Sequence, residues 1–297
     1  MSETDDKLTR QSKPNWLKIK LHNGEGYAEV ANIVASHNLH TICSSGRCPN
    51  KSECWSRRTA TFMILGDVCT RSCKFCATAT GHPLAPEQSE PQRVADSISL
   101  MGLRHAVITS VDRDDLPDGG ANHWRRTIEA VRATNPNTTI EVLVPDFEGR
   151  EESIEIVLAA SPDIVGHNIE TVERLTPLVR SKAQYRRSLT VLRAMADRGA
   201  LTKSGLMLGL GESEEEVLQT LSDLREAGVE IVTLGQYLRP TAKHYPVKEY
   251  VTPEKFEWYR KRAEQMGFRY VASAPLVRSS YLADRALECC RDSKTAE

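Results

Sequence analysis

The chain has 297 residues, of which 40% are hydrophobic, so it is long enough for one large domain with a sizeable core. Its formal net charge is -1, and a chain so close to neutral has no overall electric field that favours nucleic acid or a membrane surface as a partner. The amino terminus is polar and acidic rather than apolar or Arg-rich, and no apolar run is long enough to span a bilayer, so we expect a soluble protein of the cytoplasm.

The amino-terminal part of the sequence combines a helical pattern with a first group of cysteines. Apolar residues recur at helical spacing between positions 23 and 37. Cys43, Cys48 and Cys54 follow, with gaps of four and five residues. These gaps are too irregular for one helix face, so we predict a loop that presents three thiolates.

From residue 59 onward, strand-like runs alternate with helical patterns. The predicted strands are 60–65, 106–110, 139–144, 164–169, 205–210 and 231–238. Helix signals lie between them: Ser213 with Glu216 forms a capping-box pattern, and Thr252 precedes a proline at a first helical turn. Such alternation predicts an α/β fold with a parallel sheet and crossover helices. Six units are fewer than the eight of a TIM barrel, so we expect a partial (β/α)6 barrel with an open side.

A second group of cysteines follows the first predicted strand at Cys69, Cys73 and Cys76. Three thiolates on one tight loop can hold three corners of a cubane iron–sulfur cluster and leave the fourth iron open to a small ligand. The alternative is a zinc ion held by these cysteines and His82. Six of the eight cysteines lie between positions 43 and 76 without the paired spacing of zinc ribbons, which favours two separate clusters. Cys289 and Cys290 are expected to be incidental thiols.

The spacing of Cys69, Cys73 and Cys76, with Phe75 before the last cysteine, resembles the signature of radical S-adenosylmethionine enzymes. Further stretches across the chain resemble the lipoyl synthase family: residues 13–18, 39–41, 43–54, 111–121 and 278–281. One difference is visible, because Ser44-Ser45 stands where the family commonly has two glutamates. Neither serine is a cluster ligand by its spacing.

This resemblance implies two [4Fe–4S] clusters. Cys43, Cys48 and Cys54 would hold an auxiliary cluster with Ser280 as its fourth ligand, although Ser280 could instead cap a following helix. The second cysteine group would hold the cluster that cleaves S-adenosylmethionine to a 5′-deoxyadenosyl radical. The reaction implied is insertion of two sulfur atoms from the auxiliary cluster at carbons 6 and 8 of an octanoyl chain on a carrier protein.

The resemblance also suggests an organisation of the chain and its partners. The partial barrel would occupy residues 59–267, between extensions at 1–58 and 268–297 that carry the auxiliary cluster. Expected partners are an octanoylated lipoyl-carrier domain and a low-potential electron donor of the flavodoxin or ferredoxin type, and we expect a monomer.

Candidate contacts for S-adenosylmethionine lie at or near predicted strand ends, where chemistry occurs in such barrels. They are Thr109, Ser110, Asn168, Glu170 and Lys182. For each of them, an ordinary solvated loop is an equal alternative.

A basic run at Arg180, Lys182, Arg186 and Arg187 fits either a docking surface for an acidic carrier domain or a solvated helix face. Two other functions remain open: a different two-cluster radical enzyme, and a non-catalytic iron–sulfur or zinc protein that acts as a sensor or electron carrier.

Overall fold

The computed structural model describes residues 13–19, 25–280 and 283–292. Its centre is an eight-stranded sheet with the order β1-β2-β5-β6-β7-β8-β9-β10. β1 pairs with β2 antiparallel, and the remaining neighbours are parallel. The strands are β1 His40–Thr41, β2 Thr61–Ile64, β5 His105–Ser110, β6 Thr139–Leu143, β7 Ile164–Gly166, β8 Thr202–Leu208, β9 Ile231–Gln236 and β10 Tyr270–Ser273. β3 (Val68–Cys69) and β4 (Ala79–Thr80) form a separate pair.

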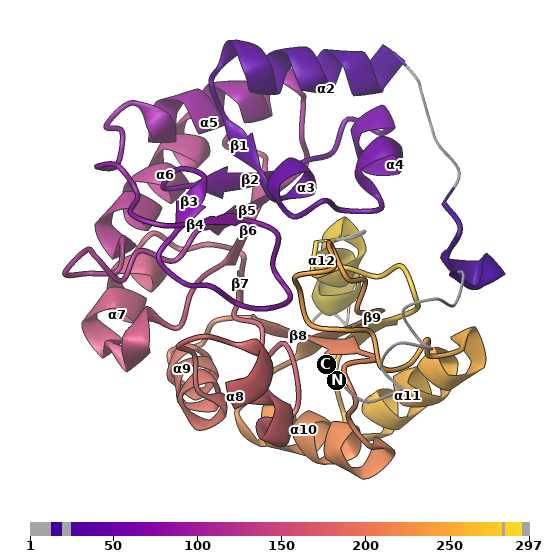
Figure 1. Cartoon of the computed structure of the whole chain (residues 1–297). Coiled ribbons are helices and arrows are strands. Elements are labelled where there is room, and N and C mark those ends of the chain that lie inside the picture. Colours follow the sequence, from indigo (N-terminus) through magenta and orange to yellow (C-terminus); the bar gives the residue numbers. More distant parts are fainter. Residues whose placement is uncertain (1–12, 20–24, 281–282, 293–297) are drawn as a thin grey trace.

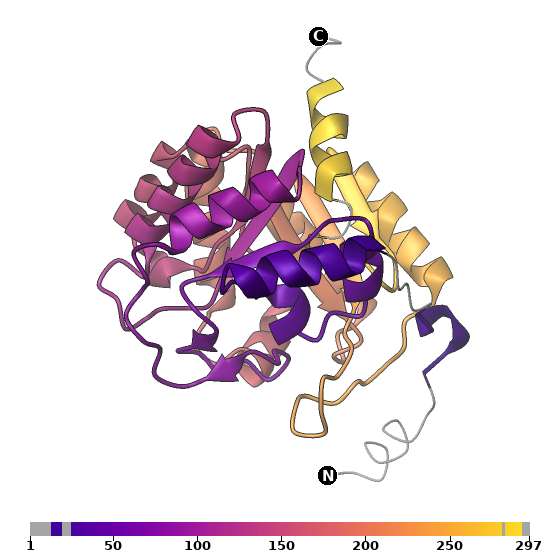
Figure 2. The same ribbon diagram turned by 90° about the horizontal axis from the view of Figure 1, so that it is seen from above.

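Helices connect successive parallel strands and lie on the outer side of the curved sheet (Figures 1 and 2). The crossover helices are α5 Glu90–Leu100, α6 Ala121–Thr134, α7 Glu151–Ala159, α9 Tyr185–Asp197, α10 Glu214–Glu226 and α11 Pro253–Gln265. The other helices are α2 Glu25–Ser36, α3 Ile42–Ser45, α4 Lys51–Ser56, α8 Thr176–Val179 and α12 Ala283–Asp292. Short 3-10 turns occur at Asn15–Leu17, Phe147–Gly149 and Glu173–Leu175.

The predicted α/β fold with six strand–helix units is confirmed. The structure adds a seventh parallel strand, β10, which pairs with β9 at the edge of the sheet. This strand has four half-buried residues, and so short a segment gives little periodic signal in the sequence. The strand order runs from β1 to β10 without closing, which leaves a partial barrel.

Local chemistry explains where the helices begin. Ser213 accepts a hydrogen bond from the Glu216 N–H, and the Glu216 carboxylate accepts one from the Ser213 N–H, so the predicted capping box opens α10. Thr252 likewise caps α11 by accepting from the Lys255 N–H. Both signals were readable from the sequence because the capping groups lie within four residues of each other.

The apolar core lies between the sheet and its outer helices. One buried cluster joins β2, β5 and β6 to α5 and α6, and a second joins β8 and β9 to α10 and α11. A smaller cluster packs Ala286 and Cys290 of α12 against Ile164 and Ile231. These two isoleucines begin β7 and β9, so α12 covers part of the amino-terminal end of the barrel. Cys290 is therefore a buried core residue.

The segment with the first cysteine group corrects one prediction. Cys43 lies in the short helix α3 and Cys54 in α4, so the predicted continuous loop is wrong, and only Cys48 lies in the connection between these helices. Thr41 begins α3 because its side chain accepts a hydrogen bond from the Ser44 N–H. The helices are too short to give a periodic pattern, which is why the sequence reads as a loop.

Candidate functional site

A cavity of about 550 Å³ lies at the carboxyl ends of the barrel strands. Cys69, Cys73 and Cys76 line it from one side, and Cys43 and Cys48 reach it from another. We call this cavity the chamber. The two cysteine groups of the sequence are thus brought to one space.

The loop that begins at Cys69 is tied to the end of β5. The backbone N–H groups of Arg71 and Asp112 donate to Cys69 Sγ at 3.4 and 3.3 Å. Burial, followed by the charge of the neighbouring Asp112 carboxylate, raises the pKa of the Cys69 thiol to about 12. Binding to a metal removes such a proton outright, and N–H donors at the sulfur then stabilise the thiolate and tune a cluster.

Arg71 holds the same loop in place from inside the protein. The residue is 5% exposed, and its guanidinium contacts three carboxylates: Asp112 at 3.2 Å, Asp114 at 2.7 Å and Asp146 at 2.7 Å. Burial alone would raise the pKa of Asp146, but Arg71 holds it well below its ordinary value. The cysteine loop is thereby fixed to the ends of β5 and β6. No local pattern in the sequence indicates this role of Arg71.

Within each group, cysteines lie close enough for the charge of one thiolate to change the pKa of another thiol. The Cys73 charge raises the pKa of Cys76, after the larger effect of burial. Within the described residues, however, no three His, Cys, Asp or Glu side chains surround a single metal-ion position. His82 is exposed and does not line the chamber. A zinc ion would need His82 as its fourth ligand at the chamber, whereas one cubane with an open iron needs only the three thiolates.

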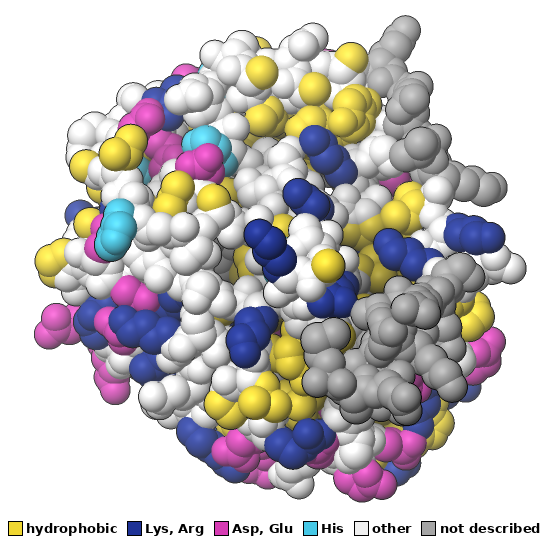
Figure 3. All heavy atoms as spheres, in the orientation of Figure 1, with side chains coloured by type: hydrophobic (Ala, Val, Ile, Leu, Met, Phe, Trp, Pro, Cys, Tyr) yellow, Lys and Arg dark blue, Asp and Glu magenta, His cyan; other side chains and the backbone are white. Residues whose placement is uncertain are grey.

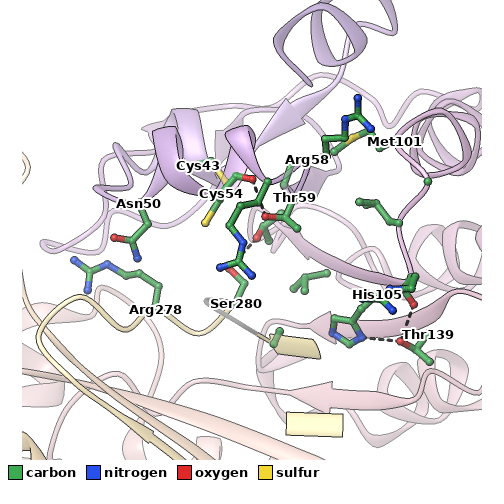
Figure 4. A pocket seen from close by; sticks show the side chains of 18 of the residues that line it. Cys43, Asn50, Cys54, Arg58, Thr59, Met101, His105, Thr139, Arg278 and Ser280 are labelled. Atoms are coloured by element: carbon green, nitrogen blue, oxygen red, sulfur yellow. Dashed lines mark hydrogen bonds between the residues drawn. The ribbon is translucent and has the colours of Figure 1, made fainter. Parts of the chain in front are cut away.

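The first cysteine group lines a second cavity of about 630 Å³ together with Ser280 (Figure 4). In that view Cys43, Cys54 and Ser280 come from three different elements and surround one space, with Arg278 beside it. Burial, followed by the charges of Cys43 and Cys48, raises the pKa of Cys54 to about 12. Three mutually close thiols and a hydroxyl form a donor set suited to one cluster.

The serines of the carboxyl-terminal motif make different contacts. Thr61 donates a 2.8 Å hydrogen bond to Ser280 Oγ, and Asn168 donates one of 3.2 Å to Ser279 Oγ. Helix α12 begins at Ala283, after two residues that lie outside the described part of the chain. Ser280 therefore faces the first cysteine group, and Ser279 faces the end of β7.

Several predicted polar residues line the chamber with unused hydrogen-bonding capacity. In the described part of the chain, Ser110 Oγ, Asn168 Oδ1 and Arg180 Nε are buried and have no hydrogen-bond partner. Thr109 also lines the chamber, but its hydroxyl donates to the Leu143 carbonyl at 3.1 Å. Buried polar atoms are nearly always paired, so these three indicate the position of a polar ligand.

Glu170 lies in an unusual backbone conformation beside them. Its φ is 68°, in the left-handed region, and its carboxylate accepts from Asn168 Nδ2 at 3.1 Å. Burial raises the pKa of Glu170, while Arg180 opposes that effect. His167 lies three residues earlier in the chain. Both of its ring nitrogens form hydrogen bonds, one with the Val144 carbonyl and one with the Ser188 hydroxyl, so it is a packed histidine. The left-handed backbone conformation of Glu170 is a strain that is typical of residues in functional sites.

Lys182 is placed differently from the other predicted contacts. It does not line the chamber, and its ammonium pairs with Glu148 at 2.5 Å and with Asp114 at 3.5 Å. Arg180, which belongs to the basic run predicted from the sequence, does line the chamber. Its Nη1 donates to the Asn168 and Ile169 carbonyls, which positions the end of β7.

Three cations of the basic run are paired with carboxylates, the first being Lys182. Arg186 pairs with Glu173 at 2.7 Å, and Arg187 pairs with Asp146 at 2.9 Å. Other basic side chains gather near the centre of the face drawn in Figure 3, around an apolar recess. Arg47 and Arg239 line the chamber in addition to the predicted residues. A docking role for the predicted run alone is therefore weakly supported.

No helix in the described residues has both the length and the apolar character that crossing a membrane requires.

Comparison with known proteins identifies the family. The Radical SAM superfamily model matches residues 63–224. A lipoyl synthase of Parabacteroides distasonis is 58% identical over 92% of this chain and 97% of its own length, and one of Christiangramia forsetii is 56% identical over 95% and 96%.

Solved structures support the fold. Methylornithine synthase, at 11% identity, aligns with a TM-score of 0.55 over 94% of this chain and 88% of its own. SuiB of Streptococcus suis, bound to S-adenosylmethionine, has a TM-score of 0.56 at 11% identity over 71% of this chain and 49% of its own. With relatives this similar over nearly its full length, the chain belongs to the lipoyl synthase family of the radical S-adenosylmethionine superfamily.

Proposed function

We propose that this chain performs the lipoyl synthase reaction with the residues described above. The reaction inserts two sulfur atoms at carbons 6 and 8 of an octanoyl chain carried by a protein, and the family uses two [4Fe–4S] clusters and S-adenosylmethionine. The observation that carries the residue assignment is that Cys43 and Cys48 of the first group line the same chamber as Cys69, Cys73 and Cys76.

The cysteines divide into two sets of ligands. Cys69, Cys73 and Cys76 would hold the cluster that binds S-adenosylmethionine and leave one iron open. Cys43, Cys48, Cys54 and Ser280 would hold the auxiliary cluster, with the hydroxyl as the weaker ligand for a soft metal site. When bound, these groups supply the reducing electron, the radical that removes hydrogen, and the inserted sulfur.

The remaining residues bind and orient. Ser110, Asn168 and Arg180 offer unpaired buried polar atoms to S-adenosylmethionine, and Thr109 and Glu170 complete that wall. Lys182 stays a prediction for the carboxylate of the same ligand. Apolar side chains form the rest of the chamber and would hold an alkyl chain away from water: Ile42, Phe75, Leu206, Met207 and Val277.

The extensions and the partners follow from the same proposal. Residues 1–58 and 268–297 would carry the auxiliary cluster on either side of the barrel at 59–267, with β10 extending the sheet. The substrate would be an octanoylated carrier domain, the electron donor a low-potential flavodoxin or ferredoxin, and the active form a monomer.

Anaerobic reconstitution tests this function. The protein is loaded with iron and sulfide, the iron is counted, and an octanoyl-lysine peptide is then followed by mass after addition of reductant and S-adenosylmethionine. About eight irons per chain, as two cubanes require, and a gain of two sulfur atoms are expected. Cleavage of S-adenosylmethionine without sulfur gain would show that the substrate is a different molecule. Bound zinc in place of iron, without cleavage, would refute the proposed enzymatic activity.

A further inference from the structure

The first cysteine group stands between two cavities. Cys43, Cys48, Arg278 and Ser280 line both the chamber and the second cavity of about 630 Å³. Cys54 lines only the second cavity, whereas Cys73 and Cys76 line only the chamber. The group can therefore be approached from two sides, and Cys54 reports on the side away from the chamber.

The second cavity opens at the end of the barrel opposite the chamber. Thr61, His105 and Thr139 line it, and they are the first residues of β2, β5 and β6. Figure 4 shows His105 and Thr139 at one end of this space and Cys43 and Cys54 at the other. Gly102 and Asn137 are exposed lining residues, so the cavity is open to solvent at its rim.

The charged side chains that line this cavity are predominantly positive. Among the described residues, its lining contains Arg57, Arg58, Arg104, Arg278 and one histidine, but no aspartate or glutamate.

Two of these arginines, Arg57 and Arg104, lack a close carboxylate partner in the described part of the chain. Arg57 lies 3.8 Å from Glu53, a weak exposed pair, whereas Arg58 is 2.8 Å from Glu29. Arg104 forms no ion pair within the described ranges and is exposed. Glu141, which approaches His105, is itself paired with Lys203 at 2.7 Å. The lining therefore presents a positive potential that concentrates anions.

We propose that this second cavity is an anion-selective entrance through which small sulfur anions, of the hydrosulfide class, reach Cys43, Cys48 and Cys54 without passing the chamber. The inference rests on the proposed assignment of these cysteines to the auxiliary cluster. A cluster that gives up its sulfur to product needs new sulfide, a substantial part of which is the hydrosulfide anion in neutral water. The cavity volume suits a small molecule.

Alkylation of the full-length chain tests the entrance. Clusters are removed by chelation under reducing conditions, and retention of fold is checked by circular dichroism against the loaded protein. Iodoacetate, an anion, and iodoacetamide, its neutral counterpart, are then compared at each cysteine by peptide mass spectrometry. The thiolate attacks the CH2–I carbon of both reagents and displaces iodide, so the ratio of their rates cancels differences in thiolate fraction and leaves the effects of access and charge.

The expected result is a higher iodoacetate-to-iodoacetamide ratio at Cys54 than at Cys76. Replacing two rim charges, Arg57→Gln with Arg104→Gln, should lower the Cys54 ratio about tenfold at low salt and leave the Cys76 ratio unchanged. High salt should reduce the wild-type ratio in the same direction. Arg198→Gln, which removes an arginine outside both cavities, serves as the matched control.

A second variant tests the route rather than its charge. Asn137→Trp narrows the rim and should slow both reagents at Cys54 while leaving Cys76 unaffected. An unchanged ratio at Cys54 in the arginine variant, or equal slowing at both cysteines in Asn137→Trp, would overturn the entrance. These outcomes are independent of sulfur insertion by the wild-type enzyme, which tests the proposed function separately.

Discussion

Thr61 Oγ1 donates a 2.8 Å hydrogen bond to Ser280 Oγ, although the two residues are 219 positions apart in the sequence. Thr61 is the first residue of β2, so the hydroxyl proposed as a cluster ligand is anchored to the first strand of the parallel sheet. A donor at this oxygen stabilises negative charge on it, and the deprotonated serine is the form that binds iron. Thr61 is thus a positioning residue for Ser280.

Removal of that donor should weaken the auxiliary cluster. Thr61→Val keeps the shape of the side chain but loses about 1.5–3 kcal/mol of hydrogen bonding to a charged group. We expect iron to leave the first cysteine group about tenfold faster or more. Iron loss to a chelator, followed by absorbance of the reconstituted protein, measures the change. Thr61→Ser, which keeps the hydroxyl, should behave like the wild type, and equal loss in both variants would contradict this role.

Removal of the Arg71 guanidinium should destabilise the whole chain. Arg71→Gln leaves Asp112, Asp114 and Asp146 without the cation that holds them together. Breaking a buried pair in this way costs about 3–5 kcal/mol. Urea unfolding of the metal-free full-length protein measures the free energy of unfolding. Arg198→Gln removes an exposed arginine pair and should cost much less; similar losses in the two variants would show that the Arg71 contacts contribute little.

The sequence could predict those parts of the molecule whose signals are local. The capping box at Ser213, the alternation of strands and helices, and both cysteine groups are patterns within a few residues or at fixed spacing. Ser280 can be proposed as a cluster ligand only because residues 278–281 match a motif of the family. The contacts that assemble the site are not local: Arg71 meets Asp146 75 positions away, and Ser280 meets Thr61. No periodicity in one sequence encodes such pairings.

The surroundings of Lys182 could not be predicted for the same reason. Its position near a predicted strand end made it a plausible ligand contact, but Glu148, from another loop, pairs with its ammonium. Arg180, two residues earlier, turns into the chamber instead. Two neighbouring cations with opposite orientation cannot be distinguished until the tertiary structure is known.

A buried pair behind the cysteine loop should make stability depend on pH. Glu90 accepts hydrogen bonds from the Leu65 N–H at 2.8 Å and from His123 at 2.7 Å, next to the turn that leads to Cys69. Burial alone would raise the pKa of Glu90, but these hydrogen bonds lower it below the ordinary 4.5. A lowered folded-state pKa gives stabilisation that is present above the ordinary value and is lost as the pH falls through the folded-state value.

Glu90→Gln should therefore reduce the free energy of unfolding by about 1–3 kcal/mol at neutral pH. The difference from the wild type should shrink below about pH 4, where the wild-type carboxylate becomes protonated. Urea unfolding of the metal-free chain at a series of pH values measures both quantities. A difference that stays constant from neutral to acid pH would show that the charge of Glu90 contributes nothing.

Substitution of Arg180 and of Lys182 tests which of these two neighbouring cations binds the carboxylate of S-adenosylmethionine. Arg180→Gln should weaken binding by about tenfold, since a buried unpaired donor of the chamber is lost. Lys182→Gln should leave affinity nearly unchanged, because its ammonium already pairs with Glu148. Equilibrium dialysis of the reconstituted protein with labelled S-adenosylmethionine measures both. The reverse order of effects would restore Lys182 as the contact and assign Arg180 to backbone support alone.

The two cysteine groups should fail in different ways when one ligand is removed from each. Cys69→Ala should abolish cleavage of S-adenosylmethionine, because the loop then lacks a ligand for the cluster that leaves an iron open. Cys48→Ala should keep cleavage and stop sulfur insertion, because Cys48 belongs to the other donor set, with Cys43, Cys54 and Ser280 around it. Methionine release and peptide mass, measured on the same reconstituted sample, separate the two steps. Cys289→Ala, a change outside both cavities, is the matched control and should retain both activities. If the Cys48 variant still forms the lipoyl product, the sulfur must come from another source, and the role assigned to the first cysteine group is wrong.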